Sequence, residues 1–220
     1  MGIWNFVKEL FISPPVAEKH LVKAVIPAKL FLNDPTTPEL VIDQVIQAKP
    51  KNLMYVVKGY MPTLTSTDSA VVRAVGVDML INNSLANFQS IISKIDKPLS
   101  VWPGVRTLQV FPVAGQGFNA FYDRSALKFF YATDSVTRKM IYAADSADVV
   151  CHELGHGILD AIRPEFWSTN SAEIWAFHEA FGDINAMISA IVRPMMAEVV
   201  LRETGGDLMK SNSLSRLAEE

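Results

Sequence analysis

Two of the four histidines in this chain of 220 residues lie on either side of a glutamate in VVCHELGHGILD, residues 149–160. On an α-helix, residues four apart share a face, so His152 and His156 can direct their imidazoles at one metal ion about 2 Å from each. Glu153 would then lie beside the ion, where its carboxylate can take a proton from a water molecule. The alternative is a partly buried helix whose histidines only find hydrogen-bond partners.

A catalytic zinc ion needs a third protein ligand and one open position. Asp160 shares the helix face but lies about 12 Å along the axis from His152, which is too far for one ion. The next predicted helix offers three candidates: Glu173, His178 and Glu179. Only Glu179 is followed, four residues later, by another carboxylate on its own face, Asp183. We therefore expect Glu179 to be the third ligand.

Asp183 has a predicted role of its own. A histidine that binds a metal usually donates its second ring N–H to a carboxylate, and Asp183 is well placed to accept this hydrogen bond, with His152 as its expected partner. The alternative is that Glu179 and Asp183 form a solvated stripe on the helix. The surrounding sequence IWAFHEAFGDINAMISA is apolar on nearly every side, and carboxylates in such a helix need a positive or metallic partner.

Prolines and serines mark the helices that must carry these residues. The first helix is predicted from about residue 146 to about 162, before Pro164, and the second from about 171 to about 192, before Pro194. A third helix is expected over 195–204, ending at a pair of glycines. The histidines and Glu179 would therefore lie on two consecutive helices.

Before residue 145 the chain mixes short β-like runs with helical stretches. The runs are LVKAVIP (21–27), LMYVVKGY (53–60), RTLQVFPV (106–113), FNAFYD (118–123) and LKFFYA (127–132). The helical periods are TPELVIDQVIQAK (37–49) and SLANFQSIISKID (84–96). We predict an α+β fold: a mixed, β-rich N-terminal lobe followed by long helices that carry the His-Glu-x-x-His stretch (HExxH) and the third-ligand glutamate.

Composition limits the partners. The formal charge is −3, and the scattered lysines and arginines argue against a nucleic acid or an anionic membrane as partner. We expect no signal peptide, because Lys8 and Glu9 interrupt the first apolar stretch, and no transmembrane segment, because Arg193 and Pro194 interrupt the late one. The localisation is not indicated by the sequence.

The stretch SADVVCHELGHGILD, followed by HEAFGD, resembles the zinc site of the thermolysin-like and fungalysin-like gluzincin metallopeptidases. The resemblance implies a zincin-like fold, zinc as cofactor and a peptide or protein as substrate. It assigns His152, His156 and Glu179 to the metal and Glu153 to catalysis. In these peptidases an Asn-Ala-Phe-aromatic strand edge lines the cleft and pairs with the substrate backbone; here the matching residues are Asn119, Ala120, Phe121 and Tyr122.

Two departures from the family pattern affect the expected function. His178 stands where relatives commonly carry an asparagine, and no histidine or tyrosine follows Glu179 to stabilise an oxyanion.

The domain organisation is predicted in three parts. Residues 1–60 form an N-terminal segment that the sequence does not assign. Residues 61–145 form an α+β lobe with the cleft-edge strand, and residues 146–220 form the zinc-site helical region, with the C-terminal catalytic lobe missing. The chain would then be an incomplete catalytic unit that needs that lobe or forms a homo-oligomer.

The expected function is zinc-dependent hydrolysis of peptide bonds without a covalent intermediate. The main alternative is a zinc-binding, non-catalytic scaffold or interaction domain derived from a metallopeptidase. A third alternative is a protein that binds no metal.

Overall fold

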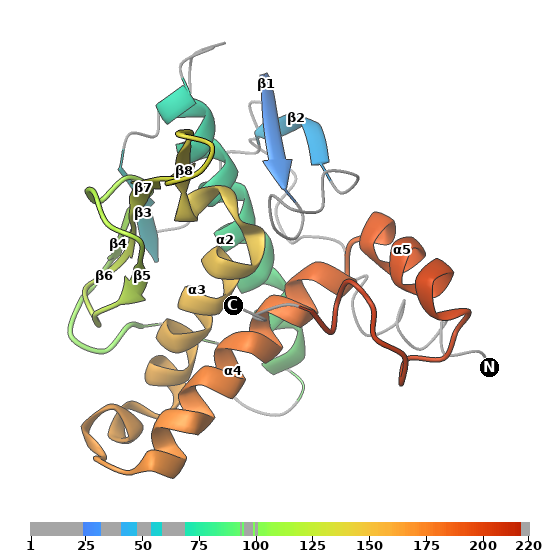
Figure 1. Ribbon diagram of the computed structural model, residues 1–220. Helices are drawn as coiled ribbons and strands as arrows, with labels where there is room; N and C mark the ends of the chain where they lie inside the picture. The colour runs from blue at the N-terminus through green and yellow to red at the C-terminus, as the bar shows by residue number, and fades with distance from the viewer. Residues whose placement is uncertain are drawn as a thin grey trace.

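The structure, a computed structural model, describes residues 24–31, 41–47, 54–58, 69–92, 94, 99 and 101–216. It is a mixed α+β fold, as the sequence predicts (Figure 1). The strands are β1 (Ala24–Phe31), β2 (Val41–Gln47), β3 (Tyr55–Val57), β4 (Leu108–Phe111), β5 (Ala120–Tyr122), β6 (Ala126–Phe129), β7 (Tyr131–Thr133) and β8 (Met140–Tyr142). The helices are α2 (Ser69–Ile92), α3 (Ala147–Ile162), α4 (Ala172–Ile191) and α5 (Pro194–Thr204), with 3₁₀ turns η2 (Ala143–Asp145) and η3 (Pro164–Ser168).

The strands form three small sheets. The largest has the order β3-β4-β6-β5, in which β3, β4 and β6 are parallel and β5 runs antiparallel to β6. β5 is therefore an edge strand among the described residues, and it contacts α3. The other two sheets are the antiparallel pairs β1-β2 and β7-β8.

One hydrophobic core joins the largest sheet to α2 and α3. On α3, an apolar stripe with the i, i+4 spacing of a helix face is fully buried: Val150, Leu154 and Ile158. It packs with apolar residues of α2, β4 and β6: Val77, Leu80, Ile81, Leu108, Val110, Leu127 and Phe129. The stripe faces the core, which leaves His152 and His156 on another side of α3.

The helices predicted after residue 145 are confirmed to within a residue or two. The hydroxyl of Ser171 caps α4 by accepting a hydrogen bond from the Ile174 backbone N–H at 3.4 Å. α5 begins with Pro194 and ends at Gly205, whose φ of 63° is a left-handed conformation that glycine adopts readily. Figure 1 shows that α4 and α5 run in different directions.

Two predictions for the first part of the chain are wrong, and one strand was missed. Within the stretch 37–49, predicted as a helix, the described residues 41–47 form strand β2, which pairs with β1. Four of its seven strand residues are β-branched, Val41, Ile42, Val45 and Ile46, and such residues favour a strand once a partner strand is available. Helix α2 begins at Ser69 rather than at residue 84, and strand β8 was not predicted.

Among the described residues, no single helix has the length and hydropathy needed to cross a membrane. α4 and α5 pass that test only as a pair, and they are bent by 97°.

Asp78 lies on α2 and is buried, with 9% of its surface exposed. Burial raises its pKa from 3.8 to about 6, opposed by a hydrogen bond from the Tyr55 side chain. The folded state therefore holds this proton more tightly than the unfolded state. The contribution of Asp78 to stability is complete below about pH 4 and is lost as the pH rises through about 6.

We expect Asp78→Asn to stabilise the protein at pH 8 by on the order of 2–3 kcal/mol, because the variant buries no charge. At pH 4 the two proteins should be nearly equal in stability. Urea unfolding at pH 4, 6 and 8 measures the difference, with Glu198→Gln, an exposed carboxylate on α5, as the control. A difference that does not change with pH would contradict the prediction.

Candidate metal centre

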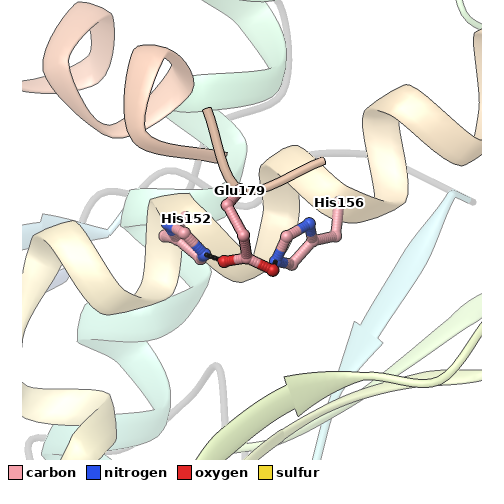
Figure 2. A group of neighbouring side chains, drawn as sticks. All are labelled: His152, His156 and Glu179. Carbon is pink, nitrogen blue, oxygen red and sulfur yellow. Dashed lines mark ion pairs between the residues drawn. The ribbon is translucent and has the colours of Figure 1, made fainter. Parts of the chain in front are cut away.

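His152, His156 and Glu179 lie together where α3 packs along α4 (Figure 2). One ligand atom from each side chain lies within 4.8 Å of the other two. The carboxylate lies between the imidazoles: its oxygens are 3.3 Å from Nε2 of His152 and 3.8 Å from Nε2 of His156. The structure therefore brings together the three residues that were predicted as ligands.

The spacing of these atoms is compatible with one bound metal ion. In a tetrahedral site with bonds of about 2.0–2.1 Å, neighbouring ligand atoms lie about 3.3–3.4 Å apart. The two separations from Glu179, 3.3 and 3.8 Å, are close to this value, and its side chain, which is 64% exposed, has room to adjust. Two imidazoles and a carboxylate are also the donor types that zinc prefers.

Asp183 contacts the second ring nitrogen of His152, Nδ1. Its Oδ1 lies 2.9 Å from Nδ1 of His152, which is the contact predicted from the sequence. Because a carboxylate can only accept a hydrogen bond, we infer that Nδ1 carries the ring proton. With Nδ1 committed to Asp183, Nε2 is the ring nitrogen that faces Glu179 and the one available to a metal ion.

His156 is held in the state that metal binding requires. Burial is the main reason that its pKa falls to about 3, and the neighbouring charges of His152 and His178 lower it further. The imidazole is therefore neutral at neutral pH, so a metal ion need not displace a proton from it.

Glu153 lies in the wall of the same cavity, which has a volume of about 290 Å³. The residue is 8% exposed, and burial raises the pKa of its carboxyl group to about 7. His152 and a hydrogen bond from the backbone of Tyr122 oppose this rise, whereas Glu179 adds to it. A carboxylate next to the ligands with this proton affinity is suited to proton transfer.

Two glycines that sequence reasoning missed allow the helices to come this close. A Cβ atom at Gly155 would lie 2.8 Å from Cα of Gly182, and one at Gly182 would lie 2.9 Å from ring atoms of His152. Side chains larger than hydrogen are therefore excluded at the crossing of α3 and α4. The sequence did carry a signal for this close approach. Both residues are glycines within apolar helices, where a glycine costs about 1 kcal/mol of helix stability relative to alanine unless packing requires it.

A buried polar group lies one turn further along α4 and was also missed. The side-chain amide of Asn185 donates to the backbone oxygen of Cys151 at 2.6 Å and to Ser84 Oγ at 3.1 Å. The hydroxyl of Ser189 donates to the same Ser84 Oγ at 2.9 Å. These bonds join α2, α3 and α4 next to His152. The i, i+4 spacing of Asn185 and Ser189 in an apolar helix was the available signal.

The predicted substrate-binding strand borders the cavity. Ala120, Phe121 and Tyr122 line it, as residues of the edge strand β5. Asn119 does not line it; this residue is exposed, and its Oδ1 accepts a hydrogen bond from the Ala120 backbone N–H at 2.9 Å.

Asp160 joins this strand to α3. It is fully buried and accepts hydrogen bonds from the hydroxyl of Tyr122 at 2.9 Å and from two nitrogens of Arg124 at 3.0 Å each. Burial and the charge of Asp160 raise the pKa of Tyr122 far above its usual range. The hydroxyl therefore stays protonated and is committed to Asp160.

The other two candidates for the third ligand lie outside the ligand group. Glu173 is exposed and accepts a hydrogen bond from Ser171 Oγ at 2.6 Å. His178 is 3% exposed and lines the cavity, and its Nε2 has no hydrogen-bond partner among the described residues. Burial lowers the pKa of His178.

Comparisons of the chain with protein-family models, with curated proteins and with solved structures give no match. The function must therefore be inferred from the geometry of the site.

We expect Gly182→Ala to weaken zinc binding by roughly tenfold or more, because the added methyl group would displace the ring of His152. Competition with a chromogenic chelator measures the affinity. Ala180→Ser, which adds one atom at an exposed position of α4, is the control and should bind zinc like the parent protein. Equal affinities for all three proteins would show that the helix crossing does not govern the site.

Asp183→Asn should weaken zinc binding by about 10- to 100-fold, because the ring of His152 loses its charged acceptor. The same competition measurement applies. Glu173→Gln removes an exposed carboxylate from the same helix, away from the ligand group, and should have no effect. A similar loss in both variants would point to overall charge rather than to the hydrogen bond.

Proposed function

We propose that this chain is a zinc-dependent peptidase of the HExxH type, with a zincin-like arrangement of the metal-binding helices. The observation that carries the proposal is the convergence of His152, His156 and Glu179 in a cavity that Glu153 also lines. The hydrogen bond from His152 to Asp183 supports it, because it orients Nε2 toward the other ligands.

His152, His156 and Glu179 would hold the ion. A zinc ion there would supply Lewis-acid chemistry, polarising the scissile carbonyl and making water a better nucleophile at neutral pH. Glu153 would take a proton from the attacking water as its oxygen bonds to the carbonyl carbon. The same carboxyl group would then give the proton to the leaving amine as the C–N bond breaks.

Strand β5 would position the peptide. It is hydrogen-bonded to β6 on one side and is the last strand of its sheet among the described residues. An extended peptide can add to such an edge through backbone hydrogen bonds. This would place the scissile bond beside Glu153, because Ala120, Phe121 and Tyr122 line the same cavity.

A specific observation favours a second candidate, a zinc-binding scaffold without catalysis. Among the described residues that line the cavity, none is a lysine or arginine, and the only tyrosine there, Tyr122, is bonded to Asp160. Tyr131 and Tyr142 stack on each other at 5.4 Å in the β7-β8 hairpin and do not line it. Removal of one oxyanion donor typically costs on the order of 100- to 1000-fold in rate, so hydrolysis should be slow.

We expect the purified chain to contain one zinc ion and to hydrolyse peptides slowly. His156→Ala should lose the zinc, because it leaves two protein ligands where a catalytic zinc site uses three. Glu153→Gln should keep the zinc but lose at least about 100-fold in hydrolysis, because an amide cannot take the proton. Elemental analysis and cleavage of a quenched fluorescent peptide measure the two properties.

Each outcome separates the candidates. Zinc with hydrolysis that depends on Glu153 supports the peptidase. Zinc without any hydrolysis supports the scaffold. Equal zinc content in the parent protein and in His156→Ala contradicts both.

A further inference from the structure

Next to the metal ligands, one wall of the cavity is aromatic. It consists of Trp167 from η3 and of Trp175 and His178 from the first turns of α4, all of which line the cavity. The ring of His178 lies 5.9 Å from that of Trp167 and 6.3 Å from that of Trp175, centre to centre. It also lies 5.8 Å from the ring of His156, so the aromatic wall continues to a metal ligand.

The two tryptophans differ in how they are held. Trp167 packs edge-to-face against Tyr122 at 5.5 Å, with the guanidinium of Arg124 at 5.7 Å from its ring. Since Tyr122 and Arg124 both bind the buried Asp160, this part of the wall is fixed. Trp175 is 48% exposed and lies one helical turn before Glu179. A large apolar ring thus remains accessible beside the site.

The charges around the cavity limit which side chains can bind there. Glu153 and Glu179 line it, and no lysine or arginine does so among the described residues, which disfavours an anionic group. A metal ion held by Glu179 would offset the charge of that carboxylate and so weaken the attraction of a cationic side chain. Aromatic rings attract other rings at centre-to-centre distances of about 4.5–7 Å, which is the spacing already present within this wall.

We propose that Trp167, Trp175 and His178 form a subsite for an uncharged aromatic side chain next to the scissile bond. The inference rests on the proposed peptidase function and names the class of peptide that the site prefers. The cavity of about 290 Å³ is at the small end of ligand sites, which suits one side chain and its carbonyl group. Nε2 of His178, which has no hydrogen-bond partner in the described part of the chain, provides a polar atom within an otherwise apolar wall.

Amino-acid hydroxamates test the subsite without turnover, because the hydroxamate binds zinc and the side chain probes the wall. Titration calorimetry with the zinc-loaded chain compares glycine, phenylalanine and lysine hydroxamates. We expect phenylalanine hydroxamate to bind on the order of tenfold more tightly than the other two. Trp175→Ala should remove most of this preference and leave the affinity for glycine hydroxamate unchanged.

Phe177→Ala is the matched control, since Phe177 is also 48% exposed on α4 but does not line the cavity; the preference should persist in this variant. Equal binding of the glycine and phenylalanine compounds overturns the subsite, as does tighter binding of the lysine compound. In either case the zinc site itself stands. A chain that holds no zinc, or that binds no hydroxamate when zinc is present, overturns both the subsite and the proposed function.

Discussion

The candidate site depends on how closely α3 and α4 approach each other. At the crossing, a Cβ atom on Gly155 would come within 2.8 Å of the backbone of Gly182. Glycine in a helix costs about 1 kcal/mol relative to alanine, so this contact is retained at some cost in helix stability. The gain is geometric: Glu179, on the turn before Gly182, reaches between two imidazoles of the facing helix.

Directional hydrogen bonds fix the position of α3 against its neighbours, which apolar packing alone would leave partly free. The buried stripe of α3 could tolerate a small rotation or slide, because dispersion contacts have little angular preference. Asn185 removes this freedom by binding the backbone of Cys151, the residue before His152. At the other end of the site, Asp160 binds Tyr122 and Arg124 and so ties α3 to strand β5. The candidate ligands and strand β5 are thereby held in fixed positions relative to each other.

The acidic groups of this region fall into two kinds. Asp160 is matched by a cation, because Arg124 forms two hydrogen bonds with it. Glu153 and Glu179 line the cavity without a lysine or arginine among the described residues around it, and Asp183 faces only the ring of His152. A bound cation would relieve the mutual repulsion of these carboxylates, and imidazoles are suited to bind one.

The sequence alone was sufficient for the features that depend on one helix. The spacing of His152 and His156, and of Glu179 and Asp183, sets a common face on each helix, and the prolines and Ser171 set the ends of these helices. Tertiary structure decided the rest. Residues 41–47 form a strand because β1 supplies a partner, which the periodicity of this segment does not reveal. The contacts of Gly155 with Gly182, of Asn185 with Cys151, and of His178 with Trp167 join separate elements. They depend on how whole helices cross, and local spacing along the chain does not specify that angle or distance.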